Sequence, residues 1–321
     1  MHKVNFKLSN RKNYIVYHKS VLYGSLKDKC RKVIGMKRKD YQPIVDISEK
    51  VKKAVMRLKE FAVNTSTGRL PILAFSGGKD SLVAYMMCIE ANIKFNPVYS
   101  PTSVDPPELI YFIKNTFNTW AKDNDYPVVE FEKYNKFSSK RVGGKMTGKI
   151  ITMWSLISNR AMPPTRLARY CCAELKERTG RDGDTIITGI RWQESKQRSN
   201  QKMVNYFKNK LMIRPIVDWS DTEVWSYIIK NNIPYCELYD KGWDRLGCIG
   251  CPLGSNQKKE LEAYPNYKKL YIRSFERMIG YRKSKGMKCE WQTGEQVLKW
   301  WVGDCEKKRK EIEGQCSMFG D

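Results

Sequence analysis

The sequence predicts an α/β protein with a doubly wound, mainly parallel sheet and a helical C-terminal extension. Short apolar runs bounded by turn residues alternate with runs of helical periodicity through the middle of the chain. Alternation of this kind is typical of parallel sheets, in which helices connect successive strands. Beyond Cys251 the apolar residues recur with helical spacing, so the end of the chain is expected to be helical.

Each element follows from a local pattern. Leu70–Phe75 is short, apolar and stopped by Ser-Gly-Gly, as expected of a buried strand, and Asp80–Ala91 then carries apolar residues on one helical face. Ser220 and Glu223 form a capping box that opens a helix through Ile229. The remaining predicted strands are 95–99, 128–131, 185–189 and 211–217, and the remaining helices are 107–122, 260–278 and 295–313.

The composition excludes several classes of protein. Only two histidines occur, His2 and His18, which nearly excludes Ser-His-Asp and Cys-His catalysis and zinc sites of the HExxH type. No apolar stretch approaches the ~18–20 residues of a membrane span, and the N-terminus lacks the apolar core of a signal peptide. We therefore expect a cytoplasmic protein whose cysteines are reduced thiols or metal ligands.

Positive charge is in large excess and is unevenly placed. The 321 residues include 59 Lys+Arg and 34 Asp+Glu, a formal net charge of +25, which favours polyanionic partners or substrates. Residues 1–40 hold 12 Lys+Arg and 2 Asp, a net of +10, and a merely solvated arm is an equal alternative there. Two stretches without any acidic residue, 133–173 and 195–217, carry a further nine and six basic residues.

A glycine-rich hexapeptide lies between the first predicted strand and the first predicted helix: Ser76-Gly77-Gly78-Lys79-Asp80-Ser81. Its two glycines permit a tight turn and the close approach of a ligand, and the start of a helix offers unpaired amides to a phosphate. The lysine adds a positive charge, and the two serines add hydroxyl donors. The Walker A spacing is absent, and an ordinary glycine-rich turn is the alternative. We predict that these six residues bind the phosphates of a nucleotide.

The hexapeptide resembles the PP-loop of the adenosine nucleotide α-hydrolase superfamily, and other segments resemble its phosphoadenosine phosphosulfate (PAPS) reductase branch. The resemblance covers about residues 70–255 and implies that a nucleotide lies over the carboxyl ends of the strands, with adenine and ribose contacts near Tyr99–Ser103. The further segments are Arg169–Lys176, Gly189–Ser195 with Arg198, Arg214–Trp219, Leu238–Gly242 and Gly247–Pro252.

Four of the ten cysteines form an adjacent pair and a Cys-x-x-Cys pair: Cys171-Cys172 and Cys248-x-x-Cys251. Gly250 permits a turn that brings the second pair to one metal centre, whereas an adjacent pair is unusual for structural zinc. The resemblance implies that the four bind a [4Fe–4S] cluster. Zinc, a redox disulfide and inert core thiols are the alternatives. Lys145 or another nearby Lys or Arg is the candidate to compensate the charge of the cluster.

Four arginines near these motifs are candidate ligands for anions. Arg166 and Arg169 approach the cysteines from the N-terminal side. Arg191 and Arg198 occur in a Gly-x-Arg-x-x-Glu-Ser-x-x-Arg context with Ser195, where their planar guanidinium groups are expected to contact phosphate or sulfate oxygens. An ordinary surface arginine is the alternative for each of the four.

Two reactions suit a PP-loop that binds an adenine nucleotide. In the first, ATP is cleaved at its α-phosphate, pyrophosphate leaves, and sulfur later displaces the adenylated acceptor oxygen. Lys79, Arg191 and Arg198 are the candidates to stabilise phosphoryl charge, and Asp80 is the candidate contact for Mg²⁺. In the second, the nucleotide is PAPS or adenylyl sulfate, a cysteine thiolate attacks its sulfur, and thioredoxin completes the release of sulfite.

The second reaction requires a reactive cysteine near the C-terminus. Cys316 is suitably placed, but the Glu-Cys-Gly order and the histidine that reductases of the family carry are absent around it. A bystander thiol in a frayed tail is therefore the favoured interpretation of Cys316.

The distribution of charge favours the first reaction. A nucleotide needs few positive groups, whereas a nucleic acid such as DNA or tRNA suits the two basic stretches and the arm. Trp192, Tyr206 and Phe207 are candidates for stacking on unpaired bases, with burial as the commoner alternative. We therefore expect an ATP pyrophosphatase that activates a nucleic acid for sulfur insertion, similar to the DNA phosphorothioation enzymes and, more distantly, to the tRNA thiolases. The sulfur donor would be a protein such as a cysteine desulfurase.

Two alternatives to this function are a sulfonucleotide reductase and a non-catalytic module that binds nucleotides or nucleic acid. In every case the predicted domains are a basic N-terminal arm at 1–50, a PP-loop nucleotide-binding domain with the cysteines at 51–256, and a helical region at 257–321. Trp291, Trp300 and Trp301 indicate that the last region packs against either the sheet or another chain.

Overall fold

A computed structural model describes residues 44–63, 67–137 and 148–303. Contacts between residues divide the chain into two units, 1–41 and 42–321, and every described residue belongs to the second unit. Lys145, Cys316 and most of the predicted basic arm lie outside the described residues. The domain boundaries near residues 50 and 256 stay predictions.

The fold class predicted from the sequence is confirmed. One six-stranded sheet has the order β3-β2-β1-β4-β6-β5, and neighbouring strands are parallel except for β5 and β6. Because the chain winds outward through β1, β2 and β3 and then crosses to β4, the direction of winding reverses between β1 and β4. The strands are β1 (Ile72–Ala74), β2 (Asn96–Tyr99), β3 (Glu130–Phe131), β4 (Thr185–Ile187), β5 (Val204–Phe207) and β6 (Lys210–Ile213).

The β5–β6 pair departs from the predicted strands. No strand is predicted at β5, and the strand predicted at 211–217 ends at Ile213. Lys208 and Asn209 have positive φ angles of 50° and 56° and form the two-residue turn of an antiparallel hairpin. The chain leaves the sheet after Ile213, because Pro215 has no N–H to donate to a neighbouring strand. The sheet is therefore parallel except for one hairpin at its edge.

Helices connect the strands largely as predicted. α3 (Lys79–Glu90) follows β1, and the helix predicted at 107–122 is a run of α4 (Pro107–Tyr111), a π-helical segment (Phe112–Phe117) and α5 (Asn118–Asp123). α8 (Asp221–Lys230) begins at the predicted capping box, in which Ser220 Oγ accepts from Glu223 N at 3.2 Å. α2 (Ser48–Phe61) and α7 (Met153–Arg160) are not predicted from the sequence.

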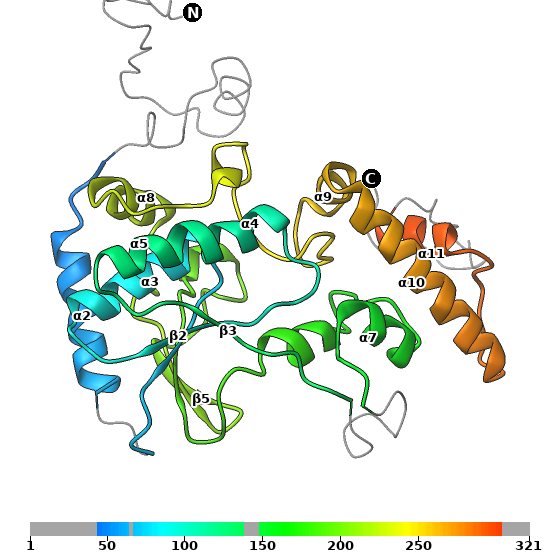
Figure 1. The fold of residues 1–321 in the computed structure, drawn as a ribbon, viewed down its shortest axis with the longest axis horizontal. Coiled ribbons are helices and arrows are strands. Elements are labelled where there is room, and N and C mark those ends of the chain that lie inside the picture. Colours follow the sequence, from blue (N-terminus) through cyan, green and yellow to red (C-terminus); the bar gives the residue numbers. More distant parts are fainter. Residues whose placement is uncertain (1–43, 64–66, 138–147, 304–321) are drawn as a thin grey trace, which may run out of the picture. The chain divides into compact units, whose positions relative to one another are not determined.

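The C-terminal helices are confirmed with two differences. The helix predicted at 260–278 is two helices, α9 (Gln257–Ala263) and α10 (Pro265–Ser284), because a proline cannot continue the first one. α11 (Gly294–Trp301) is shorter than the predicted 295–313, although residues 304–313 lie outside the described part. α10 packs against α7 and α11 (Figure 1), so the C-terminal helices find their partner within this chain.

Two clusters of buried side chains form the interior of the described residues. The larger cluster surrounds α3, with Leu73 of β1, Leu58 of α2 and Trp225 of α8 among its members. The smaller cluster joins α7, α10 and α11, and it includes Cys248 and Ile249. The glycine-rich turn is therefore supported by the first cluster, and the loop that carries Cys248 is anchored in the second.

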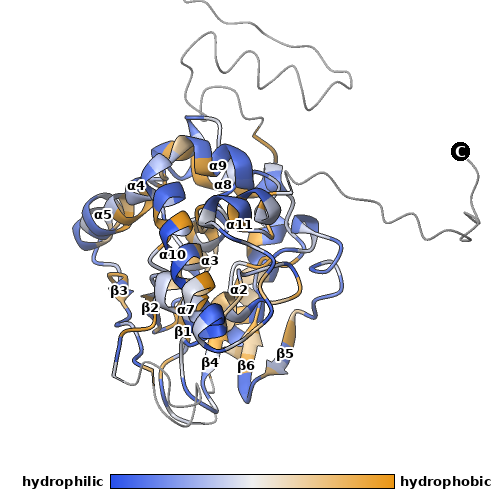
Figure 2. Ribbon diagram, turned by 90° about the vertical axis from the view of Figure 1, so that its right-hand side faces the viewer, coloured by the Kyte–Doolittle hydropathy of each residue, from blue (hydrophilic) through white to orange (hydrophobic). Residues whose placement is uncertain are grey.

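Polar and apolar residues alternate along the described helices (Figure 2). None of these helices is long and apolar enough to cross a membrane.

Candidate functional site

The turn between β1 and α3 has the geometry that the predicted phosphate loop needs. Gly77 has a φ of +72°, and a Cβ there would lie 2.7 Å from Leu109 Cδ1 and 2.8 Å from Ile113 Cδ1. A side chain at this position would strain the backbone and collide with the helical run that follows β2. Gly78 is extended (φ −80°, ψ 158°) and precedes the first residue of α3. The first turn of α3, with its backbone N–H groups, therefore begins directly at the loop.

Hydroxyl groups hold this turn in place. Ser81 Oγ donates to Gly78 O at 2.8 Å, and Ser76 Oγ donates to Ser81 Oγ at 3.2 Å. Tyr239 OH accepts a hydrogen bond from Lys79 N at 2.9 Å. The two serines predicted to donate to phosphate thus stabilise the loop itself, and Tyr239 accepts the hydrogen bond of one backbone amide, that of Lys79.

The segment after β4 meets the start of α3 with no side chain between them. A Cβ on Gly189 would lie 2.6 Å from the carbonyl carbon and oxygen of Asp80 and 2.9 Å from Ser81 N. Both segments follow neighbouring parallel strands where the winding reverses, and open α/β sheets bind their ligands at such points. Gly189 therefore brings the loop after β4 into the same site as the predicted PP-loop.

Four charged side chains meet at this reversal point. Lys79 Nζ lies 3.0 Å from Asp221 Oδ1 and 3.7 Å from Asp80 Oδ2. Arg191 Nε lies 2.7 Å from Asp80 Oδ1, and Arg191 Nη2 lies 3.1 Å from Asp221 Oδ1. The two cations are almost fully buried, with 5% and 2% of their surfaces exposed. Two positive and two negative charges thus balance one another, and each buried cation is compensated.

Two of the predicted phosphate ligands, Lys79 and Arg191, already contact carboxylates of the protein in this network. Arg191 also donates to Trp219 O at 3.0 Å, so all three nitrogens of its guanidinium group contact protein acceptors. Nothing in the sequence marks Asp221 as part of this site, because an acidic residue in the first turn of a helix is explained by the helix dipole alone. The contacts of Lys79 and Arg191 with phosphate, and of Asp80 with Mg²⁺, stay predictions.

Ser195 and Arg198 form part of an exposed turn. Arg198 pairs with Glu194, and Arg198 N donates to Ser195 Oγ at 3.2 Å. Trp192 begins the same segment, and its Nε1 donates to Gln201 O at 2.7 Å. The structure thus brings Arg191 to Asp80, whereas Arg198 contacts Glu194. The predicted roles of Ser195 and Arg198 in anion binding are untested.

The four cysteines predicted to bind a cluster are free thiols, and three of them lie near one lysine. Cys248 when ionised, then Asp105 and, more weakly, Cys172 and Cys251 raise the pKa of Lys176, against the opposing effect of burial. Lys176 is thus a cation beside the thiols, the position for which Lys145 or another nearby Lys or Arg is the candidate from the sequence. No three His, Cys, Asp or Glu side chains of the described residues form a group that could hold a single metal ion.

The thiols of the adjacent pair differ in acidity. A hydrogen bond from Cys171 lowers the pKa of Cys172, with smaller contributions from the charges of Lys176 and Arg169. Burial raises the pKa of Cys248 to about 11. Cys172 is therefore the more readily ionised of these thiols. Arg169 lies beside the cysteines as expected from its position in the sequence.

The loop after β2 touches the loop that carries Cys248. Cys248 Sγ donates to Thr102 Oγ1 at 3.4 Å, and Thr102 Oγ1 donates to Asp105 Oδ1 at 2.7 Å. Ile249 N donates to Val104 O at 2.8 Å. The region expected to contact adenine and ribose is therefore in direct contact with the loop that carries Cys248.

Two side chains of α9 hold the turn between Cys248 and Cys251. Gly250 has a φ of +70°. Glu260 Oε2 accepts from Gly250 N at 2.8 Å, and Gln257 Nε2 donates to Gly250 O at 3.2 Å. Burial raises the pKa of Glu260. No sequence pattern indicates this clasp, because it depends on where α9 packs. On the other side of the loop, Arg166 Nε donates to Pro252 O at 3.0 Å.

Residues 70–253 match the family described as the phosphoadenosine phosphosulfate reductase domain. The matched range includes the glycine-rich turn, the charged network and both cysteine pairs, and it is more than half of the chain. The chain belongs to the PAPS reductase family. The resemblance recognised in the sequence is thereby confirmed.

Relatives in and around the PAPS reductase family match only part of their own length. The chain is 28% identical over 245 residues to the uncharacterized protein MJ0973 of Methanocaldococcus jannaschii, covering 73% of this chain and 52% of that protein. It is 35% identical over 89 residues to adenosine 5′-phosphosulfate reductase of Neisseria meningitidis, covering 26% of this chain and 36% of that enzyme. The chain thus spans about half, or less, of the length of these relatives.

One solved structure of a PAPS reductase has a lower sequence identity to this chain than these relatives do. The crystal structure of phosphoadenylyl-sulfate reductase from Candida auris is 16% identical, with a TM-score of 0.41, and covers 64% of this chain and 98% of that chain.

Proposed function

We propose that this member of the PAPS reductase family binds an adenine nucleotide at residues 76–81 and cleaves ATP to activate a nucleic acid for sulfur insertion. The observation that carries the nucleotide site is the contact between Gly189 and Asp80, because it places the loop after β4 against the glycine-rich turn at the reversal point of the sheet. The amides and dipole at the start of α3 favour a phosphate there.

The charged network beside the loop supplies stabilisation for this reaction. An acceptor oxygen attacks the α-phosphorus of ATP, the bond from that phosphorus to the bridging oxygen breaks, and pyrophosphate leaves with the electron pair. Lys79 and Arg191 exchange their carboxylate partners for phosphate oxygens and stabilise the leaving charge. Asp80, released from Arg191, would hold a Mg²⁺ ion, which would supply positive charge to balance the phosphate oxygens. The persulfide sulfur of a donor such as a cysteine desulfurase then attacks the adenylated atom and AMP leaves, and a second thiol reduces the resulting disulfide to free the sulfur on the nucleic acid.

The four cysteines are the proposed ligands of a [4Fe–4S] cluster. Each cysteine of such a cluster binds a different iron, so the sulfurs do not converge on one point as they do on a single zinc ion. Two features support this ligand set: Lys176 compensates negative charge, and α9 fixes the turn between the second pair. When bound, the cluster supplies iron atoms that hold sulfur or carry electrons.

Exposed aromatic side chains beside a basic stretch support a nucleic acid as the acceptor. Trp192, Tyr206 and Phe207 expose 42%, 74% and 45% of their surfaces, so the alternative that they are buried is wrong. They lie in or next to residues 195–217, which contain six basic and no acidic residues. Unpaired bases stack on such side chains while Lys and Arg contact the phosphates.

A sulfonucleotide reductase is the second candidate, favoured by the 35% identity to the Neisseria reductase. That reaction requires a cysteine that attacks the sulfur of the nucleotide and is then released by thioredoxin. Its candidate, Cys316, lies outside the described residues.

Turnover by protein prepared without oxygen separates the two functions. We expect pyrophosphate release from ATP that increases when DNA or tRNA is added and that is lost in Lys79→Ala. Sulfite release from PAPS or adenylyl sulfate with thioredoxin, abolished by Cys316→Ser, would establish the reductase instead. If ATP stays uncleaved with every DNA and RNA tested, the favoured function is wrong.

Iron content and visible absorbance test the cluster independently of turnover. We expect Cys172→Ala and Cys248→Ala to lose both signals. Cys289→Ala is the matched control, because Cys289 is a free thiol outside the two pairs, and it should keep both signals. A colourless protein that contains one zinc ion per chain would refute the cluster.

A further inference from the structure

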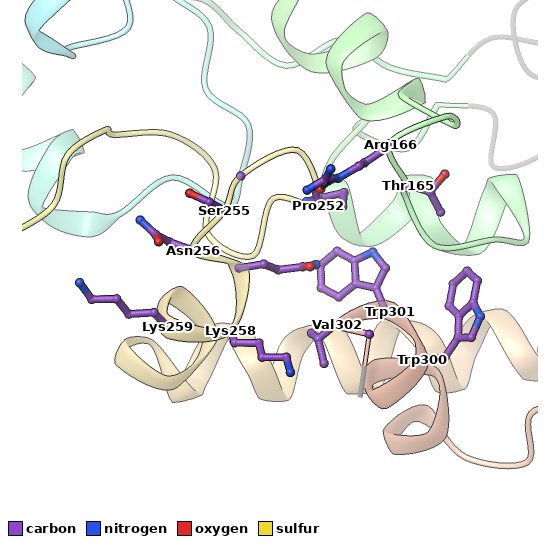
Figure 3. A pocket seen from close by; sticks show the side chains of 13 residues that line it. Thr165, Arg166, Pro252, Ser255, Asn256, Lys258, Lys259, Trp300, Trp301 and Val302 are labelled. Atoms are coloured by element: carbon purple, nitrogen blue, oxygen red, sulfur yellow. Dashed lines mark hydrogen bonds between the residues drawn. The ribbon is translucent and has the colours of Figure 1, made fainter. Parts of the chain in front are cut away.

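A pocket of about 630 Å³ lies beside the cysteine loop and is separate from the site at β1 and β4. Three segments form its walls, around residues 165–166, 252–259 and 300–303 (Figure 3). Its volume falls within the ~300–1,000 Å³ that small-ligand pockets occupy. No step of the proposed reaction uses it.

The charged groups of the pocket suit an anion. Arg166 and Lys258 contribute positive charges, whereas Lys259 Nζ lies over the ring of Trp243, and no acidic side chain is among the described residues that line the pocket. Arg166 is anchored through Nε on Pro252 O at 3.0 Å, and its two terminal nitrogens have no hydrogen-bond partner among residues 44–63, 67–137 and 148–303, so they suit a phosphate. Lys258 lies across the pocket from Arg166, on the far side of Trp301 in Figure 3.

An exposed indole ring provides an apolar wall. Trp300 exposes 41% of its surface, and its ring packs at a tilt against Trp291, with 5.1 Å between the two ring centroids. The neighbouring Trp301 is buried, and its Nε1 donates to Pro164 O at 2.6 Å. This hydrogen bond fixes the end of α11 against the loop that carries Arg166. A nucleobase can stack on Trp300 while the cations bind the phosphates on either side of it.

We propose that this pocket holds one unpaired nucleotide of a nucleic-acid strand, with its base on Trp300 and its two flanking phosphates on Arg166 and Lys258, one on each. The proposal rests on the proposed function, in which a nucleic acid is the acceptor, and it assigns a place to that strand. Gln257 lines the pocket and also donates to Gly250 O, so the bound strand contacts the segment that holds the cysteine turn. A free nucleotide shares this chemistry, and the test separates the two sources.

Fluorescence anisotropy of labelled single-stranded DNA and RNA oligonucleotides tests the pocket without ATP. We expect Trp300→Ala and Lys258→Glu each to weaken binding about tenfold, since each removes a stacking surface or a phosphate contact. Trp300→Phe keeps an aromatic face and should retain most of the affinity. Two controls change an exposed ring or an exposed charge elsewhere and should bind as the wild type does: Tyr111→Ala and Lys59→Glu.

Equal affinities of the wild type and Trp300→Ala would overturn the proposal. Displacement of the oligonucleotides by AMP or UMP at concentrations matching that of the strand would overturn it as well, because the pocket would then belong to a free nucleotide. The binding result can be read separately from the result for ATP cleavage. A wild-type protein that binds oligonucleotides through Trp300 but never cleaves ATP contradicts the proposed reaction and supports the nucleotide pocket.

Discussion

Arg191 Nε donates to Asp80 Oδ1 at 2.7 Å and so joins the segment after β4 to the first turn of α3. The same guanidinium group reaches Asp221, at the start of α8, at 3.1 Å. One arginine therefore ties together three elements around the point where the sheet reverses its winding. Because Arg191 is buried, solvent screens its two ion pairs less than it screens a surface pair.

Arg191→Ala is expected to lower the free energy of unfolding by about 2–4 kcal/mol, because Asp80 and Asp221 would share a single buried cation. Arg191→Lys keeps the charge without the planar fork and should recover only part of the loss. Urea unfolding measures both variants. Arg198→Ala is the control, since its partner Glu194 lies on an exposed turn, and its effect should be small. Equal losses for the two alanine variants would contradict a special role for Arg191.

Gly189→Ala is expected to cost about 1–3 kcal/mol of stability and to weaken nucleotide binding, because its Cβ would meet backbone atoms of Asp80 that cannot rotate away. Gly280→Ala is the matched control on α10. Nothing lies within 4 Å of a Cβ there, so alanine should stabilise the helix by about 1 kcal/mol. Thermal unfolding and nucleotide titration measure the two effects. Wild-type nucleotide affinity in Gly189→Ala would exclude this contact from the site.

Arg57 and Asp218 are expected to make stability depend on pH in the acidic range. Burial alone would raise the pKa of Asp218, but hydrogen bonds of 2.5 and 3.2 Å from Arg57 hold it below its ordinary value of 3.8. The stabilisation is fully present above the unfolded pKa and is lost as the pH falls through the lower folded pKa. Arg57→Ala should therefore lower the free energy of unfolding by about 1–3 kcal/mol at neutral pH and flatten its decline between roughly pH 5 and pH 2.

Urea unfolding at a series of pH values measures this effect. Lys52→Ala removes an exposed ion pair with Glu49 from the same helix, and because solvent screens that pair it should alter the pH dependence far less than Arg57→Ala does. Parallel curves for the wild type and Arg57→Ala would show that Asp218 is not the titrating group.

Glu260→Ala is expected to loosen the turn between the second pair of cysteines, because Gly250 N loses its acceptor. A hydrogen bond to a charged group contributes ~1.5–3 kcal/mol, so alkylation of Cys251 in the metal-free protein should accelerate about tenfold. Glu260→Gln keeps an oxygen acceptor and should be intermediate. Mass spectrometry after iodoacetamide treatment gives the rates. Glu262 is exposed on the same helix, so Cys251 of Glu262→Ala should be alkylated at the wild-type rate. A wild-type rate in Glu260→Ala would show that the hydrogen bond from Gly250 N does not hold the turn.

Much of the fold could be predicted because its elements carry local signals. β1 and β4 are short apolar runs stopped by turn residues, and the cap of α8 needs no tertiary information. β5 has no such signal. Tyr206 and Phe207 are exposed at the edge of the sheet, so no buried face marks the strand, and its turn of Lys208 and Asn209 contains no glycine.

The site could be predicted only where its residues are contiguous in the sequence. Ser76–Ser81 and each cysteine pair indicate their chemistry without a fold. Asp221, Lys176 and Glu260 belong to the same sites through packing, because each contacts residues that a different element supplies. Before the elements are placed, each of these three charges has an ordinary explanation on the surface of a helix.

The charges of Lys79, Arg191, Asp80 and Asp221 sum to zero, and this affects how a nucleotide arrives at the site. Two opposed pairs exert little net field beyond the Debye length of ~8 Å at physiological salt. Long-range attraction must come from the rest of the chain, whose formal net charge is +25. Added salt should therefore slow the association of a nucleotide far more than it speeds its departure.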